Sequence, residues 1–209
     1  MKIFVIADNP AAGRVERWVA DWLEENPGAT FGGRISGESG TATASSAGTV
    51  PQEGDRLVFA DPDPARRRAR AKDFHASPAE PFTFVHPAAV TGERVSLATG
   101  VVIGPGATIT CDVEVGAFTL VDPQATIGHD NRIGPFCTIG RGADVARLCR
   151  LGEGVRLGAR ARLIPERRLG PGAVVEDAAV VVRHVKAGER VAGNPARRVR
   201  SPNSGSPRW

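Results

Sequence analysis

The chain has 209 residues, of which 41% are hydrophobic and 24% are charged, the balance of an ordinary globular protein with one large or two small domains. Its net charge of +4 comes from scattered arginines without interleaved aromatic residues, so we expect no nucleic-acid binding. Three cysteines are too few and too irregular for a disulfide framework or a zinc site and indicate a reducing cytoplasm, and no apolar stretch reaches the roughly 18 residues of a membrane span.

Residues 1–84 are predicted to form a small α/β domain. Two apolar stretches are expected as buried strands, and two helices alternate with them: strand Lys2–Ile6, helix Gly13–Glu25, strand 56–60 and helix Pro64–Asp73. Residues 36–52 are rich in Gly, Ser, Thr and Ala, which indicates a flexible loop. The β-α-β-α order predicts a Rossmann-like unit with a parallel sheet.

Two features of this first domain could bind phosphate. The turn at residues 7–13, between the first strand and the first helix, carries a single glycine, so it is a weak nucleotide signature. The second helix is strongly basic, and we expect its cations to form a solvated face rather than a phosphate site: Arg66, Arg67, Arg68, Arg70 and Lys72.

A strict six-residue repeat begins at Leu97 and ends at Val181. All fifteen positions at this interval are Leu, Ile or Val. The next residue is usually Gly, and small side chains prevail two residues before each aliphatic position. An amphipathic helix repeats at about 3.6 residues and a simple strand at about 2, so neither explains a period of six.

A left-handed parallel β-helix explains this period. Three six-residue segments make one triangular coil, and each segment is a short strand followed by a turn. The aliphatic residue points inward and stacks on the next coil at about 4.8 Å, while Gly relieves backbone strain at the corner. We therefore predict an all-β solenoid over residues 85–200, in preference to a β-sandwich, followed by a disordered tail at 201–209.

One corner of the predicted coils carries a histidine. With eighteen residues to a coil, His129 lies in an outward-facing column with Cys111, Arg147, Pro165 and Arg183. A single histidine in a solvent-facing turn is by default a polar turn residue, and Cys111 beneath it raises an alternative, an acyl-cysteine relay. No other member of this column is a histidine, so we expect no metal site.

The pattern as a whole resembles the hexapeptide-repeat sugar acyltransferases, which acetylate sialic acid or nucleotide-linked amino sugars. The resemblance rests on residues 125–134 (ATIGHDNRIG), on Leu163-Ile164-Pro165 and on the closing residues 191–196 (VAGNPA). It implies that His129 is the general base and that Asp130 orients it. It also implies a homotrimer with acetyl-CoA in the groove between neighbouring prisms, and cofactor contacts from Arg147, Ala161 and Asn194.

This chain departs from that family where the acceptor would bind. Asp8 puts negative charge in a turn where a pyrophosphate would need bare amides. Gly33 and Arg34 stand where the family has carboxylates that hold a nucleotide. We therefore expect Asp8 and Arg34 to bind a small polar or anionic acceptor rather than a uridine-diphosphate amino sugar, with Arg34 and the basic helix suited to a carboxylate or a single phosphate.

The family's Gly-Asn pair one coil beyond the histidine is replaced here by Arg147 and Leu148. A backbone amide survives any side chain, so the oxyanion contact near Arg147 can persist. We interpret the sequence as that of an acetyl-CoA-dependent acyltransferase acting on an amine or hydroxyl of a sugar-like acceptor, with His129 removing the acceptor proton. The alternative is a non-catalytic trimeric β-helix that keeps the fold for binding or assembly.

Overall fold

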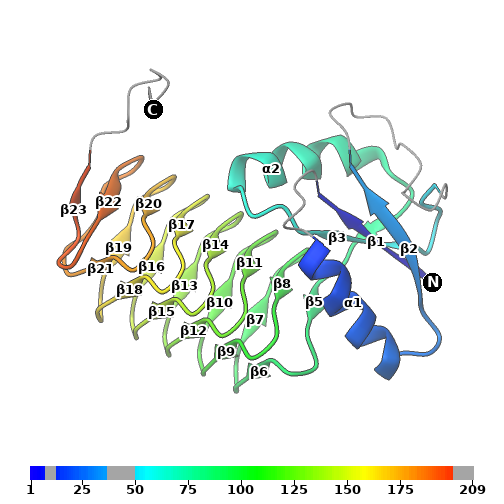
Figure 1. Cartoon of the computed structure of the whole chain (residues 1–209), viewed down its shortest axis with the longest axis horizontal. Coiled ribbons are helices and arrows are strands. Elements are labelled where there is room, and N and C mark those ends of the chain that lie inside the picture. Colours follow the sequence, from blue (N-terminus) through cyan, green and yellow to red (C-terminus); the bar gives the residue numbers. More distant parts are fainter. Residues whose placement is uncertain (8–12, 37–49, 200–209) are drawn as a thin grey trace, which may run out of the picture.

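The computed structural model describes residues 1–7, 13–36 and 50–199 (Figure 1). They form two parts that pack against each other, which we call the N-terminal unit (residues 1–81) and the coils (residues 84–199). Three predictions fall wholly or largely outside the described residues: the substrate contact of Asp8, the flexible loop at 36–52 and the disordered tail at 201–209.

The N-terminal unit is built on a parallel sheet. Its four strands lie in the order β2-β1-β3-β4 and are β1 (Lys2–Ile6), β2 (Thr30–Ile35), β3 (Arg56–Phe59) and β4 (Glu80–Pro81). Strands β1 and β3 confirm the two predicted strands. Strand β2 was not predicted, because its paired glycines conceal a strand pattern. A Cβ on Gly32 would lie only 2.5 Å from the ring of Phe4, so the glycine makes room for that ring.

One helix covers each face of this sheet. Helix α1 (Gly13–Glu25) packs Trp18 and Val19 against Val5 of β1 on one face. Helix α2 (Pro64–Asp73), followed by the 3-10 turn η2 (Phe74–Ala76), lies over the other face, where Phe74 packs with Phe59. The predicted Rossmann-like domain is therefore confirmed only in a coarser form: the unit consists of parallel strands and helices, and a full Rossmann domain is not evident.

The coils form a parallel β-solenoid, which confirms the fold predicted from the six-residue repeat (Figure 1). Short strands follow one another every six residues and make three sheets along the stack. Face 1 contains β5 (Phe84–Val85), β8 (Val102–Ile103), β11 (Leu120–Val121), β14 (Thr138–Ile139), β17 (Arg156–Leu157), β20 (Val174–Val175) and β22 (Arg190–Ala192). Face 2 contains β6 (Val90–Thr91), β9 (Thr108–Ile109), β12 (Thr126–Ile127), β15 (Asp144–Val145), β18 (Arg162–Leu163) and β21 (Val180–Val181). Face 3 contains β7 (Ser96–Leu97), β10 (Glu114–Val115), β13 (Arg132–Ile133), β16 (Arg150–Leu151) and β19 (Arg168–Leu169).

Equivalent residues of successive coils are eighteen positions apart in the sequence. Thr126 of β12 pairs with Thr108 of β9 on one side and with Asp144 of β15 on the other. The second residue of nearly every strand points into the prism, as the fully buried Ile127 does, and these side chains form one continuous apolar cluster. Burial of each such side chain contributes about 1.5–3 kcal/mol, so the repeat itself supplies the core.

The corners stack closely because glycine occupies the position after many inward residues. A Cβ on Gly128 would lie 3.0 Å from the backbone nitrogen of Arg147 in the next coil. At the tip of the same turn, non-glycine residues take the left-handed conformation, with φ of 58° at Asp130 and 61° at Leu148. Such a backbone costs on the order of 1 kcal/mol and persists because the surrounding ladder fixes it.

The N-terminal unit packs on face 1 at the early coils. Phe84, Val102 and Leu120, the outward residues of β5, β8 and β11, are fully buried in one cluster with residues of α1 and the sheet. At the edge of this contact Arg14 pairs with Asp122 at 3.0 Å, and burial raises the pKa of the Asp122 carboxyl. The corner between faces 2 and 3 is opposite face 1, so it lies on the far side of the prism from the N-terminal unit.

Arg67 fixes α2 to the coils and corrects one prediction. Its side chain is only 1% exposed, and it donates hydrogen bonds to four backbone carbonyls and one hydroxyl: those of Asp61, Phe118, Phe136, Cys137 and Thr138. Burial lowers the pKa of the guanidinium to about 10, so it stays cationic at neutral pH. The basic helix is therefore not the solvated face that we predicted, since Arg67 and Arg70 are both buried.

At the other end of the stack, β22 pairs antiparallel with β23 (Arg197–Arg198) around a turn that contains the cis peptide bond between Asn194 and Pro195. The longest helix within residues 1–7, 13–36 and 50–199 is α1, with 13 residues, and none there is long and apolar enough to cross a lipid bilayer.

Candidate active site

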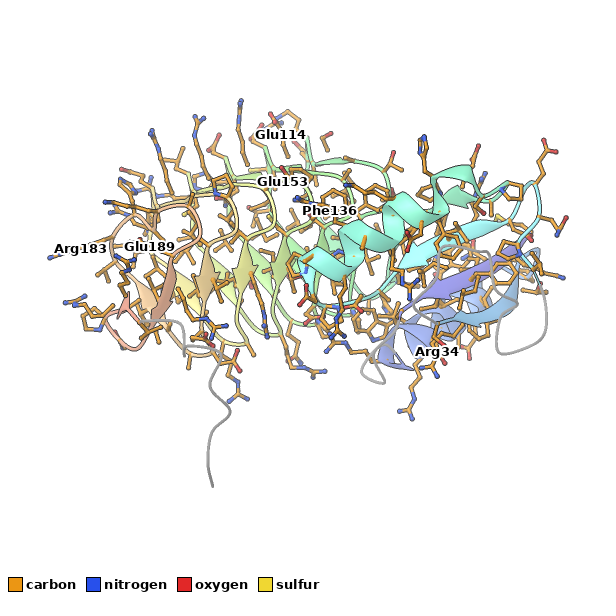
Figure 2. The ribbon with its side chains drawn as sticks, turned by 90° about the horizontal axis from the view of Figure 1, so that it is seen from above. Arg34, Glu114, Phe136, Glu153, Arg183 and Glu189 are labelled. Carbon is orange, nitrogen blue, oxygen red and sulfur yellow. The ribbon has the colours of Figure 1, made fainter. Side chains whose placement is uncertain are left out.

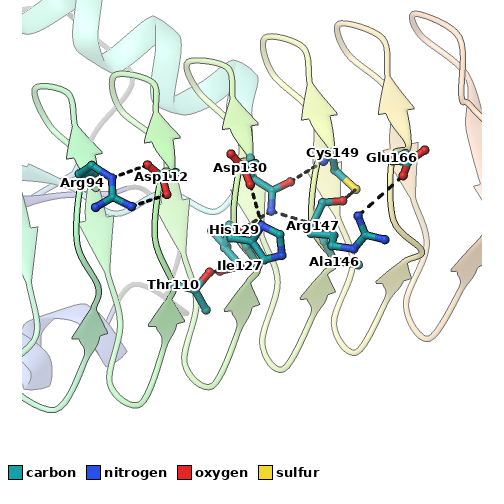
Figure 3. Close-up of polar contacts among 12 residues, drawn as sticks. Arg94, Thr110, Asp112, Ile127, His129, Asp130, Ala146, Arg147, Cys149 and Glu166 are labelled. Atoms are coloured by element: carbon teal, nitrogen blue, oxygen red, sulfur yellow. Dashed lines mark hydrogen bonds and ion pairs between the residues drawn. The ribbon is translucent and has the colours of Figure 1, made fainter.

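His129 and Asp130 form the tip of the turn that joins β12 on face 2 to β13 on face 3 (Figure 3). Nδ1 of His129 lies 2.7 Å from Oδ2 of Asp130, and both side chains are about half exposed, at 46% and 50%. A carboxylate only accepts hydrogen bonds, so Nδ1 carries the proton and Nε2 of the neutral ring keeps its lone pair. The corner thus presents an oriented imidazole whose Nε2 can accept a proton.

Backbone hydrogen bonds confirm the predicted column through His129. The amide of Asp130 donates to the carbonyl of Cys111 at 3.2 Å, and the amide of Leu148 donates to the carbonyl of His129 at 3.0 Å. The corner therefore repeats coil by coil, with Cys111 before the histidine and Arg147 after it. Cys111 keeps a free thiol that is partly exposed.

Asp112 lies one coil before Asp130, at the equivalent position, and its charge is already neutralised by an arginine. Arg94 binds Asp112 through two hydrogen bonds of 2.6 and 2.8 Å, and this pairing holds the pKa of the Asp112 carboxyl below its ordinary value. Figure 3 shows Asp112 one coil before Asp130 and Arg94 on the coil before that. Asp130, by contrast, turns its carboxylate to the imidazole.

The backbone N–H of Arg147, rather than its guanidinium, lies at the histidine corner. Its guanidinium points along the stack to Glu166, with 3.8 Å between Nη1 and Oε1, away from His129 (Figure 3). Its backbone N–H stands beside Gly128 and has no acceptor among the described residues. An unpaired N–H in the coil next to the imidazole can donate to an oxygen that gains negative charge.

Asn131 supports this turn, and sequence reasoning missed it. The side chain is fully buried, and its amide donates to the carbonyls of Gly128 at 2.6 Å and Ala146 at 2.9 Å. Its Oδ1 accepts from the amide of Cys149 at 2.7 Å. One side chain thus joins the histidine turn to the following coil. The signal was present, because an amide occupies a position where the repeat places small or apolar residues.

The two other predicted cofactor contacts lie apart from the histidine corner. Ala161 is fully buried inside the prism, and its N–H and C=O bond to Gly158 and Asp144. Asn194 is exposed in the turn between β22 and β23. The structure does not bring either residue together with His129, so their contact with a cofactor stays a prediction from the resemblance.

The predicted acceptor residue Arg34 is also distant from His129. It lies on the edge strand β2, and its Nε is 3.4 Å from Oε1 of Glu16 in α1. Figure 2 shows Arg34 on the N-terminal unit and Glu114, on face 3, at the opposite side of the molecule. Within a single chain the structure does not unite Arg34 with the histidine corner.

The two remaining thiols, those of Cys137 and Cys149, are buried inside the prism. Burial raises the pKa of the Cys137 thiol to about 11, and it also raises the pKa of Cys149, so both are neutral packing residues. In the part of the chain that the structure describes, no three His, Cys, Asp or Glu side chains are grouped as metal ligands.

Comparison with known proteins gives a structural likeness at low sequence identity. No protein-family profile matches the sequence, and no curated protein is significantly similar to it. Among solved structures, the acetyltransferase domain of PglB from Neisseria gonorrhoeae, in complex with acetyl coenzyme A, superposes with a TM-score of 0.81 and 22% identity, over 95% of this chain and 98% of that one.

Two further structures cover both chains almost completely. A mutant of perosamine N-acetyltransferase from Caulobacter crescentus, in complex with CoA and GDP-perosamine, has a TM-score of 0.83 and 23% identity over 96% of this chain and 98% of that chain. WeeI from Acinetobacter baumannii has a TM-score of 0.82 and 19% identity over 95% and 100%. The likeness therefore extends over both the N-terminal unit and the coils and shows that this chain has the fold of these structures.

Proposed function

We propose that this protein transfers an acyl group, in the first place acetyl, from an acyl-CoA to an amine or hydroxyl of a sugar-like acceptor. The observation that carries the proposal is the 2.7 Å contact between His129 and Asp130 on an outward corner. The unpaired N–H of Arg147 in the next coil adds an oxyanion donor. The shared fold supports the same reaction, because solved structures of that fold include acetyltransferases bound to CoA.

In this mechanism Nε2 of His129 accepts the proton of the acceptor as its nitrogen or oxygen attacks the thioester carbonyl carbon. Asp130 stabilises the imidazolium that forms. The N–H of Arg147 donates to the carbonyl oxygen as it becomes negative. The carbon–sulfur bond then breaks, and the imidazolium returns the proton to the leaving thiolate, so the products are the acylated acceptor and CoA.

Replacing the histidine tests this assignment. His129→Ala should reduce acetyl transfer by about 100-fold or more, the usual contribution of a general base. Its loss should cost less than about 1 kcal/mol of stability, because the side chain is half exposed and leaves no cavity. The assay is release of CoA thiol from acetyl-CoA with a panel of amino sugars, alongside thermal unfolding. His75→Ala, an exposed histidine of the N-terminal unit, is the matched control.

Asp130→Asn separates orientation from charge, because asparagine also tolerates the left-handed backbone of this turn. We expect turnover to fall by about tenfold or more with CoA binding unchanged. Full activity in both His129→Ala and Asp130→Asn would remove the assignment. CoA binding without any acyl transfer in the parent protein would favour the non-catalytic scaffold instead.

Three finer features complete the proposal. We infer that the coil is left-handed, that the chain divides near residue 84 into an N-terminal domain and an acyltransferase domain, and that Ala161 and Asn194 lie along the path of the acyl-CoA. The division has support in the sheets, because β4 still pairs with β3 whereas β5 pairs with β8 of the coils.

A further inference from the structure

Face 3 carries a row of arginines beside the histidine corner. Arg132, Arg150 and Arg168 are the outward residues of β13, β16 and β19, and each pairs in register with the next. Neighbouring strands lie about 4.8 Å apart, and like charges directly opposite each other are destabilising. A row of three cations therefore needs a source of negative charge.

Elsewhere the coils provide that charge from a neighbouring strand. Arg162 pairs with Asp144 at 3.0 Å on face 2, and Arg132 lies 3.5 Å from Glu114 at the start of the row on face 3. Arg150 and Arg168 lack such a partner within the described residues, and both are exposed. Among the described residues, carboxylates thus balance the charge of Arg132 but not that of the next two arginines in the row, in the coils after that of His129.

These two arginines line a hollow that runs along the histidine corner. It has a volume of about 490 Å³ and extends from Asp130 past Leu148 to His184. Nδ1 of His184 accepts a hydrogen bond from the amide of Arg168 at 3.1 Å, so the proton of the neutral ring is on Nε2. Arg150, Arg168 and His184 therefore supply only donors, which suits an anion with several acceptor oxygens.

The other two side chains of the hollow are already engaged. Glu166 pairs with Arg147, and Arg167 donates to the carbonyls of Pro165 and Val182 at 3.0 and 3.4 Å. Asp130, which also lines the hollow, is the side chain whose Oδ2 lies 2.7 Å from Nδ1 of His129. An anionic group bound between Arg150 and Arg168 would therefore lie in the same hollow as Asp130, the partner of the imidazole.

The arginines that the sequence suggested for binding an anionic acceptor already interact with other groups of the protein. Arg34 lies beside Glu16, Arg67 is buried against backbone carbonyls, and Arg68 pairs with Glu153. We propose that Arg150 and Arg168, with His184, form a phosphate subsite for the acceptor, so that the protein prefers a phosphorylated sugar over its neutral counterpart. This inference rests on the proposed acyl transfer at His129 and names the substrate class of that same site.

Calorimetric titration tests the subsite without turnover. Glucosamine 6-phosphate and glucosamine serve as the charged and neutral probes. We expect the phosphorylated probe to bind at least about tenfold more tightly, and Arg150→Gln and Arg168→Gln each to weaken it by about tenfold, the equivalent of one charge-assisted hydrogen bond. Arg162→Gln, an outward arginine on face 2 with its own carboxylate partner, is the matched control and should change the affinity by less than about twofold.

Titration with CoA and with 3′-dephospho-CoA identifies the source of the phosphate. If the arginine variants weaken CoA and leave 3′-dephospho-CoA unchanged, the subsite serves the donor and the acceptor proposal is wrong. Equal affinity for both sugar probes, or equal affinity of the parent and both variants, overturns it as well. Acetyl transfer to glucosamine is assayed separately. If transfer occurs although the subsite fails, the proposed function stands. Phosphate-dependent binding without any transfer would support the subsite and contradict the proposed function.

Discussion

The buried amide of Asn131 holds the turn on which His129 lies. Because it is fully buried and serves three backbone groups, we expect Asn131→Ala to lower the free energy of unfolding by about 2–4 kcal/mol. Turnover should also fall, since the Gly128 carbonyl loses its donor and the imidazole loses its fixed position. Urea unfolding and the CoA-release assay measure the two effects.

Thr126→Ala provides the comparison for Asn131. Thr126 is an outward, exposed residue of β12 in the same coil, so its truncation should alter stability by less than about 0.5 kcal/mol. A similarly small change in Asn131→Ala would show that the turn holds itself, and the supporting role assigned to the amide would be lost.

The three cysteines should differ in reactivity because of their burial. Cys111 is partly exposed, whereas burial raises the pKa of both Cys137 and Cys149. Reaction with iodoacetamide at neutral pH should therefore label Cys111 alone in the folded protein and all three thiols in urea, as read by mass spectrometry. Cys111→Ala should keep nearly full acetyl transfer. A loss comparable to that of His129→Ala would instead support an acyl-cysteine relay.

At the scale of the elements, α2 is held in place chiefly through one buried cation. Arg67→Ala would leave four backbone carbonyls and a hydroxyl without their donor, so we expect a loss of about 3–5 kcal/mol and faster amide exchange in α2. Arg66→Ala, one residue earlier and exposed, should alter neither quantity measurably. Unchanged exchange in Arg67→Ala would mean that the apolar contacts alone hold the helix.

The difference between what the sequence predicted and what it concealed follows from the range of the contacts. The solenoid was predictable because each inward residue meets its equivalent eighteen positions away, so one local rule determines every corner and places His129 on an outward one. The acceptors of Arg67 are 51 to 71 residues away for all but one of its bonds. No periodicity in a basic helix reveals that arrangement, and the pattern alone favoured a solvated face.

For the whole molecule, the resemblance to the hexapeptide-repeat acyltransferases implies a trimer, and the position of the histidine corner fits a site between copies. The N-terminal unit packs on face 1, while His129 lies at the corner opposite that face. An acceptor that contacted Arg34 as well as His129, as the sequence suggested, would need the N-terminal unit of a second copy. We expect sedimentation at micromolar concentration to give three times the mass of one chain. The mass of a single chain would contradict this arrangement and would leave the face 3 hollow as the acceptor site within one subunit.

The contact between the two parts ends at the coil of Glu153, before the end of the stack, and this sets how the protein can vary in length. Arg68 reaches as far as Glu153, and the N-terminal unit makes no further ion pair or hydrogen bond with described residues beyond that point. Removal or insertion of eighteen residues after it would keep every remaining ladder in register and shift the later coils and the closing hairpin along the stack by one coil. The distance from His129 to that end can thus change in steps of about 4.8 Å, which lets insertions of whole coils match the groove to donors of different reach without disturbing the catalytic corner.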